Sequence, residues 1–438
     1  MRYPTPHNQS RLGFCYNTSN THHRQVDLHR WLPKFESMGV GWLMLNATIE
    51  RAIPEGFIRG LIAAGIEPVI HFGMSPATPP SLPDFRLLIQ QYARWGIHYI
   101  CLFDQPNLQA QWTNKNWAQT DLVERYLDVF IPLAREVIKI GMWPVFSPLA
   151  LGGDYWDTAF LRTSMEALLR RGQTRVLDKL VLGAYANIHD YSLQWGAGGP
   201  ERWIGARPYF TPDNEEDQKG FRVADWYRAI TSAELGRSLP MILFETGQHA
   251  EIVRSVDTDR QIAQLLSGFP IHGLDPVDED VLAFQFQNLI ADSTLGESDQ
   301  AFFTADGNAM KSAQTLTKWQ AQHKNAHPQP KSVPVTIKQS TPNPTTSHTN
   351  FTIRHYVLLP KFEWGVSDWH LNAVRPFVKK HDATVGCSAE EAIHASRVTL
   401  VGDESVFPTE IELRLQQAGC LVERIDGTGT DIATKLAS

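Results

Sequence analysis

Short hydrophobic runs alternate with longer amphipathic segments through the first three quarters of the chain. Each short run has the length of a buried strand, and each longer segment has the three-to-four-residue hydrophobic spacing of a helix. The pattern predicts eight strands, at Leu12–Asn17, Gly41–Asn46, Glu67–Phe72, Tyr99–Phe103, Trp143–Pro148, Lys179–Ala184, Met241–Phe244 and Val281–Phe286.

Helices are expected between these strands, and most of them end just before a glycine. Glycine is the usual helix stop because it takes the left-handed conformation without a steric penalty. Eight strand–helix units in about 320 residues fit an α/β fold, a (β/α)8 TIM barrel, better than an open sheet. The predicted helices are Val26–Met38, Phe57–Ala64, Phe85–Trp95, Leu122–Ile140, Phe160–Arg171, Val223–Leu235, Ile262–Ser267 and Met310–Gln320.

The alternation stops after residue 323, which divides the chain into three parts. Residues 324–350 contain five prolines, many Ser and Thr, and no periodicity, so they predict a Pro/Thr-rich linker. Residues 351–438 then predict a small parallel α/β, Rossmann-like module. Its strands are expected at His355–Leu359, Val398–Val401 and Leu421–Ile425, and its helices at Asp368–Lys380, Ala389–Ser396, Thr409–Ala418 and Thr430–Leu436.

Composition narrows the function classes. The net charge of −7 gives no basic surface for nucleic acid. No apolar run approaches the ~20 residues of a membrane-spanning helix, so membrane insertion is not expected. The first twelve residues lack a signal-peptide pattern. The sequence therefore predicts a cytoplasmic protein, or one released by a non-classical route or by lysis, and association with the cell envelope stays open.

Four cysteines and the absence of binding motifs limit the chemistry further. The cysteines do not form a disulfide framework. Cys15 and Cys101 are interpreted as core residues. Cys387 and Cys420 could pair, although two separate thiols are favoured. There is no Gly-x-Gly-x-x-Gly after the first strand and no metal-ligand spacing, so neither a cofactor nor a metal is expected.

Polar side chains stand at the ends of nearly all the predicted strands. In TIM barrels the active site lies at the carboxyl ends of the strands, so these residues are candidates for one site. Alternatively, strand ends are polar simply because they approach solvent. The candidates are Asn17, Asn46, His71, Asp104, Gln105, Asn107, Tyr185, Asn187, His189, Glu245 and Gln285.

Glu245 is the sharpest single candidate, because it directly follows the apolar run 241–244. Burying an unpaired carboxylate is costly, and such groups gather at working sites. A structural ion pair with a nearby arginine is the alternative.

Large aromatic residues in the connections after strands 4 to 6 favour a carbohydrate ligand. Trp112, Trp156 and Trp203 lie in these connections, and their flat faces suit the C–H faces of sugars. Alternatively, some of them only fill space under loops. The connection 189–221 has the length of a functional lid, and within it Glu201 and Arg202 either line the cleft or pair with each other.

Four motifs together resemble clan A of the glycoside hydrolases. They are FDQPN at 103–107, LVLGAYANIH at 180–189, FETG at 244–247 and VLAFQFQNLI at 281–290. In that clan strand 4 ends in Asn-Glu-Pro, with the Glu as general acid/base, and strand 7 ends in a nucleophilic Glu. The resemblance covers about residues 10–320 and implies that Glu245 is the nucleophile.

The chain departs from the clan at the acid/base position, where Gln105 stands after Asp104. An amide cannot exchange a proton as a carboxyl group does. Either Asp104, or a loop carboxyl such as Asp154 or Glu201, supplies the acid, or the barrel binds glycans without cutting them. Neighbouring strand residues face opposite sides, so Asp104 would need a bend near Pro106 to reach the cleft. Gln105 and Glu245 are expected to face each other.

The end of the chain has its own resemblance. Residues 397–437 resemble the cell-wall-binding repeats of clostridial-type surface proteins, with Tyr356–Ala395 as a diverged second copy. The leading hypothesis is therefore a glycoside-hydrolase-like protein whose partner is a polysaccharide or cell-wall glycan. A non-catalytic carbohydrate-binding barrel and a structural surface or virion protein are the alternatives.

Overall fold

The structure is a computed structural model, and the chain divides into two compact units, Met1–Ser332 and Val333–Ser438. Each unit is described by itself. The described residues are 3–16, 22–188, 190–247, 255–291, 301–323, 353–360, 374–375, 377–378, 383–403, 406–425 and 435.

The first unit is built on a closed barrel of eight parallel strands in sequence order. The last strand pairs with the first, Phe284 beside Leu12, and this pairing closes the barrel. The predicted TIM barrel is thereby confirmed. The strands are β1 Leu12–Cys15, β2 Trp42–Asn46, β3 Glu67–Phe72, β4 Tyr99–Leu102, β5 Trp143–Phe146, β6 Val181–Asn187, β7 Met241–Gly247 and β8 Val281–Phe286.

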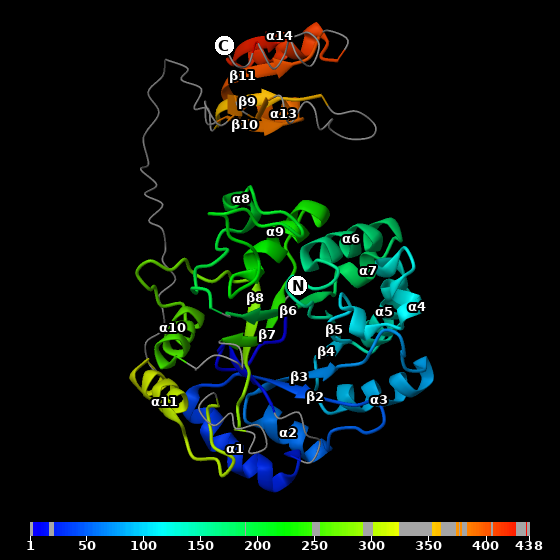
Figure 1. Ribbon diagram of the computed structural model, residues 1–438, viewed down its shortest axis with the longest axis vertical. Helices are drawn as coiled ribbons and strands as arrows, with labels where there is room; N and C mark the ends of the chain where they lie inside the picture. The colour runs from blue at the N-terminus through cyan, green and yellow to red at the C-terminus, as the bar shows by residue number, and fades with distance from the viewer. Residues whose placement is uncertain are drawn as a thin grey trace, which may run out of the picture. The chain divides into compact units, whose positions relative to one another are not determined.

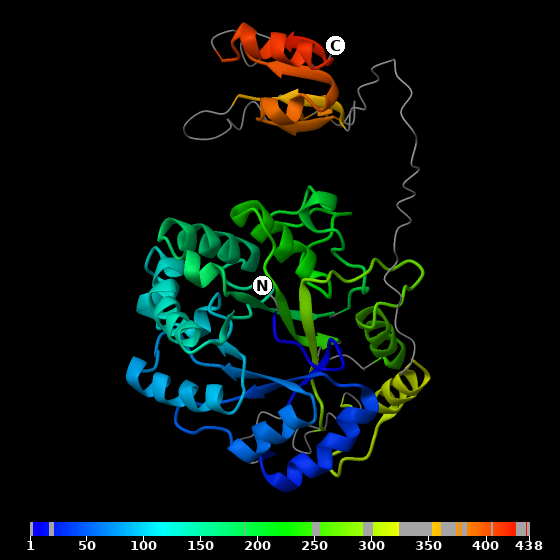
Figure 2. The same ribbon diagram turned by 180° about the vertical axis from the view of Figure 1, so that it is seen from behind.

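Helices surround the strands in both views (Figures 1 and 2). None in the described part of the chain is long and apolar enough to cross a membrane. The long helices are α1 Gln25–Met38, α2 Glu55–Ala63, α3 Leu82–Arg94, α5 Leu122–Lys139, α6 Asp157–Arg170, α9 Val223–Leu235, α10 Val256–Leu266 and α11 Lys311–His323. Four short ones were not predicted: η2 Gln109–Gln111, α4 Asn114–Trp117, α7 Thr174–Leu177 and α8 Gly199–Arg202.

The barrel unit has two hydrophobic layers, one inside the strands and one between strands and helices. Inside lie large side chains such as Trp42, Tyr99, Trp143 and Phe244. Because side chains alternate along a strand, every second residue of each strand faces the inside of the barrel. At the carboxyl ends of the strands, inward-facing residues line the opening of the barrel, which we call the mouth.

The second unit contains a four-stranded parallel sheet in the order β10-β9-β11-β12. One strand, β10, was missed. The predicted helix Ala389–Ser396 was wrong at its end, because α13 stops at Ala392 and Ala395 already pairs with Ile353. Most of Thr430–Leu436 and most of Asp368–Lys380 fall outside the described residues. The elements are β9 Ile353–Leu358, β10 Thr384–Gly386, α13 Ala389–Ala392, β11 Ala395–Val401, α14 Thr409–Gln417 and β12 Leu421–Ile425.

No disulfide joins the two cysteines of this unit. Cys420 is buried and its thiol contacts the carbonyl oxygens of Ala392 and Ile393, each at 3.6 Å, while Cys387 is half-buried. Two separate thiols, the favoured prediction, are confirmed.

Candidate active site

Three residues at the mouth of the barrel have a left-handed backbone although none is glycine. The φ angles are 62° at Phe103, 43° at Gln105 and 47° at Glu245. Such conformations cost about 1–3 kcal/mol each and cluster at functional sites. All three lie where β4 and β7 end, so the backbone is strained at the two positions where carboxyl groups were expected.

The strain at Phe103 reverses the alternation of β4. Tyr99 and Cys101 face the inside of the barrel, so Phe103 should face inward and Asp104 outward. Instead the Phe103 ring is fully buried in the outer layer, 6.0 Å from the Tyr126 ring of α5. Asp104 therefore points into the mouth. The bend expected near Pro106 is at Phe103.

Tyr185 of β6 holds Asp104 in this position. Its hydroxyl donates a hydrogen bond of 2.6 Å to Asp104 Oδ1. Burial raises the pKa of Tyr185 well above its ordinary value, and the negative charges of Asp104 and Glu245 raise it further. The phenol thus stays protonated as a donor, and it lies within the electrostatic reach of both carboxyl groups.

Glu245 reaches the same mouth through an irregular strand. Ile242 and Phe244 face inward, so strict alternation would turn Glu245 outward. The pairing of β7 with β8 shifts register between Leu243 and Thr246, which together with the left-handed φ breaks the alternation. Asn187 of β6 then donates to Glu245 Oε2 at 3.5 Å.

Cys15 at the end of β1 is the site residue that the sequence did not indicate. It is half-buried at the mouth, and both burial and the negative charge of Glu245 raise the pKa of its thiol. The thiol therefore stays neutral. Its interpretation as a core residue holds in that Cys15 packs against the inner layer, and that of Cys101, which is fully buried in that layer, is confirmed.

A cleft of about 590 Å³ extends from Asp104 over the ends of β2 and β3. Two predicted residues, Asn46 and His71, line it together with Asp104, and Gln105 does not. His71 also supports the wall, since its Nε2 lies 3.0 Å from the Phe103 carbonyl oxygen and its ring stacks on Phe244. The cleft-lining residues that the sequence missed include Thr48, Glu50, Met74, Ser75 and Thr78.

Gln285 is a buried amide inside the barrel without a hydrogen-bond partner among the described residues. It is 0% exposed, and neither its Oε1 nor its Nε2 is bonded. Gly13 makes room for it, because a Cβ at Gly13 would lie 2.5 Å from Gln285 Oε1. Thr246 Oγ1 and Asn187 Oδ1 are likewise buried without a partner in the described part of the chain. Unbonded buried polar atoms are costly, which favours a polar ligand or water there.

Several other predicted ligands have structural roles instead. Asn107 is buried, and its amide is bonded to the backbone of Ala150 and Tyr155. The indole N–H of Trp112 donates to the Pro106 carbonyl at 2.7 Å. The Asn107 contacts join the β4 and β5 connections, and the Trp112 contact lies within the β4 connection, so neither the Asn107 amide nor the Trp112 N–H is free for a sugar.

Trp203 and Trp156 also serve the loops that carry them. Trp203 Nε1 donates to the Ala197 carbonyl at 3.0 Å, and Trp156 is 8% exposed at the start of α6. Asp154, one of the alternative acids, accepts a hydrogen bond of 2.8 Å from the Gln109 backbone. Asn17 and His189 lie outside the described residues.

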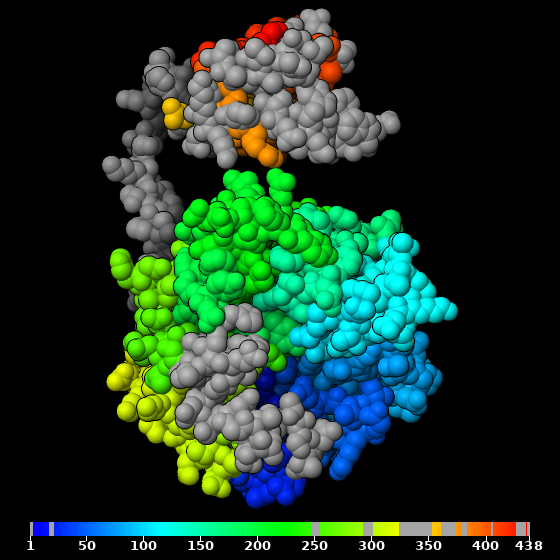
Figure 3. All heavy atoms as spheres, in the orientation of Figure 1, coloured from blue at the N-terminus to red at the C-terminus, as the bar shows by residue number. Residues whose placement is uncertain are grey.

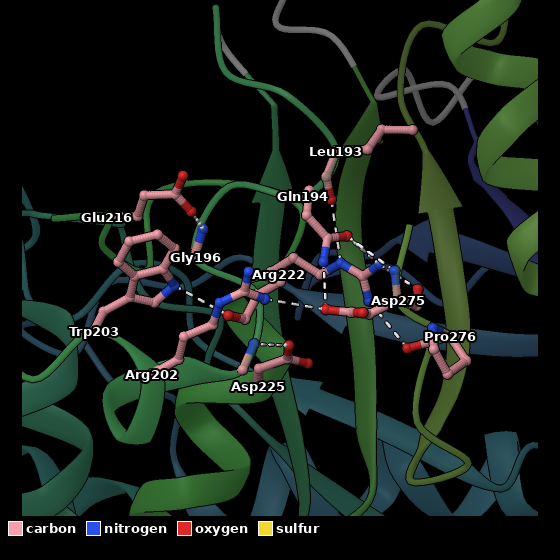
Figure 4. Close-up of polar contacts among 12 residues, drawn as sticks. Leu193, Gln194, Gly196, Arg202, Trp203, Glu216, Arg222, Asp225, Asp275 and Pro276 are labelled. Atoms are coloured by element: carbon pink, nitrogen blue, oxygen red, sulfur yellow. Dashed lines mark hydrogen bonds and ion pairs between the residues drawn. The ribbon is translucent and has the colours of Figure 1, made fainter. Parts of the chain in front are cut away.

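The long connection between β6 and α9 is fixed to the rest of the barrel. Figure 4 shows Arg222 at its centre, 2% exposed, donating to the carbonyl oxygens of Leu193, Asp275 and Pro276. Arg202 pairs with Asp275 at 3.4 Å and not with Glu201. The part of this connection around Arg202 and Arg222, where a lid was expected, is therefore held in place by these contacts.

No family model matches the chain, and no curated protein matches it. Similar solved structures include a family 39 glycoside hydrolase from Bacteroides cellulosilyticus WH2, at 15% identity over 73% of this chain and 65% of that one (TM-score 0.47). A monomeric beta-xylosidase from Caulobacter crescentus CB15 has 15% identity over 73% and 70% (TM-score 0.46). A GH5_18 protein from Bifidobacterium longum, in complex with Manb1-4GlcNAc, has 10% identity over 95% and 96% (TM-score 0.46). These similarities are remote, so residue roles rest on the geometry above.

Proposed function

We propose that the barrel hydrolyses glycosidic bonds of a polysaccharide, with Glu245 and Asp104 as its two carboxyl groups. The observation that carries this proposal is the left-handed Phe103, which turns Asp104 into the mouth and onto Tyr185. The negative charge of Glu245 also raises the pKa of Tyr185. The carboxyl group that the altered strand-4 motif lacks at position 105 is thus supplied from position 104.

In this proposal Glu245 attacks the anomeric carbon while protonated Asp104 gives its proton to the departing oxygen. The covalent glycosyl intermediate is then hydrolysed by a water that passes its proton to Asp104. Retention of configuration needs the two carboxyl groups about 5–5.5 Å apart. Tyr185 is a positioning residue, since it holds Asp104 through the phenol.

The substrate in this proposal is a carbohydrate because the mouth offers side chains that can hydrogen-bond to sugar hydroxyls. Asn46 and His71 line the cleft, and the amide of Gln285, which has no hydrogen-bond partner among the described residues, lies inside the barrel. Amide groups both donate and accept, as sugar hydroxyls require. We further propose that the C-terminal unit attaches the barrel to a cell-wall glycan, on the resemblance of residues 397–437 alone.

A second candidate, a barrel that binds glycans without cutting them, is favoured by Gln105 alone. Activity of variants separates the two. If Asp104 is the acid, the wild type hydrolyses oligosaccharides, and Asp104→Asn lowers the rate by about 10²–10⁴-fold. Aryl glycosides with good leaving groups should be affected less in their first step. Added azide should partly restore turnover, because it needs no general base.

Controls are available within the same loops. Asp154→Asn changes a carboxyl group tied to the Gln109 backbone and should leave the rate unchanged, whereas Glu245→Gln should abolish it. If Gln105→Glu creates activity in an inactive wild type, the non-catalytic barrel is correct and Asp104 is not the acid. The hydrolysis rates of the wild type and the variants are measured by chromatography of the products.

A further inference from the structure

The connection between α8 and α9 exposes an aromatic pair away from the residues that line the mouth. Tyr209 is 60% exposed, Phe210 62%, and Ile204, five residues earlier, 68%. No other aromatic side chain of the described residues is exposed to this degree. Exposed apolar patches can mark binding sites. Figure 3 shows this connection, in green, at the surface of the barrel unit.

The aromatic pair stands on a rigid base. Tyr209 has a left-handed backbone (φ 65°), and its hydroxyl accepts a 2.9 Å hydrogen bond from the Trp156 backbone N–H. Its ring lies 5.5 Å from the Trp156 indole. An aromatic residue persists in this strained conformation only when its surroundings determine it. The ring is therefore presented in one orientation before any ligand arrives.

Buried Asp217 fixes the segment just after the pair. Thr211 donates to its Oδ2 at 2.9 Å, and Trp195 to its Oδ1 at 3.1 Å. Burial by itself would raise the pKa of Asp217, but the hydrogen bonds from Trp195, Lys219 and Thr211 outweigh it and lower the pKa. The carboxylate anchor thus keeps its charge. Together with the Arg222 contacts of Figure 4, it holds both ends of the connection.

A small pocket of about 240 Å³ lies beside the pair, between α6 and α9. Trp156, Trp226 and Ile230 line it with apolar side chains, and Arg162 and Arg207 line it with charged ones. Arg162 is paired with Glu234, whereas Arg207 pairs with no carboxylate among the described residues. Thr158 and Thr163 add hydroxyl groups. Flat apolar walls with a few donors suit a sugar ring.

We infer that Tyr209, Phe210 and this pocket form a second carbohydrate-binding site, separate from the mouth. The occupant is one ring of a longer glycan chain, since the volume is below the ~300 Å³ of pockets for drug-sized ligands. A protein partner fits less well, because stable interfaces use about 20–30 residues a side and the exposed patch has three side chains. The site retains polymer near the barrel and does not depend on catalysis at Asp104 and Glu245.

Affinity electrophoresis of the full chain tests this inference. The gels contain soluble xylan, mannan, laminarin or solubilised peptidoglycan. At least one polymer should retard the wild type, and the double change Tyr209→Ala with Phe210→Ala should raise its dissociation constant at least tenfold. Leu87→Ala, at an equally exposed position on α3 (62%), is the matched control and should migrate as the wild type. Turnover of an aryl glycoside should be the same in all three.

Two further variants keep the result interpretable. Tyr209→Phe retains the ring and loses only the hydroxyl anchor, so it should bind more strongly than the alanine variant. The same pair of alanine changes is also made with Glu245→Gln. If that background is inactive yet its retardation still depends on Tyr209 and Phe210, the second site stands even where the proposed hydrolysis fails.

Three outcomes would overturn the inference. The alanine variant could bind every polymer as tightly as the wild type, or no polymer of the panel could retard the wild type. Sedimentation could instead show a wild-type dimer that the alanine changes dissociate, which would make the patch a contact between copies of the chain.

Discussion

Phe103 combines a left-handed backbone with an aromatic side chain, a combination that costs about 1–3 kcal/mol. The cost is offset because the ring is fully buried beside Tyr126 in the outer layer. Burying a Phe side chain contributes about 1.5–3 kcal/mol. One strained residue therefore exchanges the faces of Phe103 and Asp104 without a large net loss of stability.

Tyr185→Phe tests whether Tyr185 positions Asp104. The change removes a charge-assisted hydrogen bond, typically worth about 1.5–3 kcal/mol, so kcat should fall about 10- to 100-fold with little change in KM. A hydrogen bond to a carboxylate favours its charged form, and its loss should move the pH–activity profile to higher pH. Both are measured by steady-state kinetics on one oligosaccharide from pH 4 to pH 9.

Tyr126→Phe is the control for a general packing effect. Its hydroxyl lies 2.7 Å from Ser147 Oγ in the outer layer, so its loss should alter stability and leave the pH profile in place. If both variants shift the profile equally, Tyr185 has no special part in positioning Asp104.

Prediction of single site residues from the sequence succeeded where the position at the end of one strand was enough to identify them. Glu245 was identified because a carboxylate follows a buried strand. The sequence predicted that Asp104 needs a bend near Pro106 to reach the cleft. The reversal lies at Phe103 instead, because a left-handed phenylalanine leaves no signal in the sequence. Asn107 and Trp112 resembled ligands, but Asn107 bonds to a carbonyl oxygen of the β5 connection and Trp112 to one of its own connection, which sequence spacing does not reveal.

Among the elements, hydrophobic periodicity identified all eight barrel strands because each is buried on both faces. The misses are short. Residues 384–386 form a strand only by pairing with β9, and α4, α7 and α8 are four residues each. Such segments are too short for a period to appear, and tertiary contacts decide their structure.

Asp157 at the start of α6 should make stability depend on pH. Burial raises its pKa from 3.8 to about 6, although Gly152, Gln218 and Tyr227 donate hydrogen bonds to it. Between these values the folded state binds more protons than the unfolded one, so the free energy of unfolding falls as pH rises from about 4 to 6 and is level above. Two pH units correspond to about 3 kcal/mol.

Asp157→Asn removes this titration and keeps the shape of the side chain. Between pH 4 and pH 7, the free energy of unfolding of the wild type should fall by up to about 3 kcal/mol relative to that of the variant. Urea unfolding at each pH measures it. Asp128→Asn, at an exposed ion pair with Arg171, is the control. A difference between wild type and Asp157→Asn that stays constant with pH would contradict the assignment.

Arg222 should carry much of the stability of the β6–α9 connection. Arg222→Met leaves the buried carbonyl oxygen of Leu193 without its donor, a loss that costs about 1–3 kcal/mol, and it also removes the bond to the Pro276 carbonyl. Thermal unfolding should therefore show a clear fall in Tm. Arg202→Ala breaks a pair that is 54% exposed on both sides and should cost under about 1 kcal/mol. Equal effects would contradict the central role of Arg222.

At the scale of the whole molecule, two compact units suggest two functions on one chain. The mouth and the second carbohydrate-binding site at Tyr209 and Phe210 both belong to the first unit. We therefore expect the first unit alone to hydrolyse and retain the polymer. Attachment to a cell wall, in our proposal, should be lost without the second unit.

Trypsin should separate the two units within residues 324–350. This segment contains Lys324, Lys331 and Lys338 among its prolines, and proteases cut first where few contacts hold the chain. We expect a resistant fragment of about 320 residues that keeps its cooperative unfolding and its turnover of soluble oligosaccharides. Replacing the three lysines by Gln should slow this first cut, which gel electrophoresis and mass spectrometry would locate. If the fragment instead unfolds as soon as it forms, or if the first cuts fall within the barrel, the barrel depends on the second unit and the two are one folding unit.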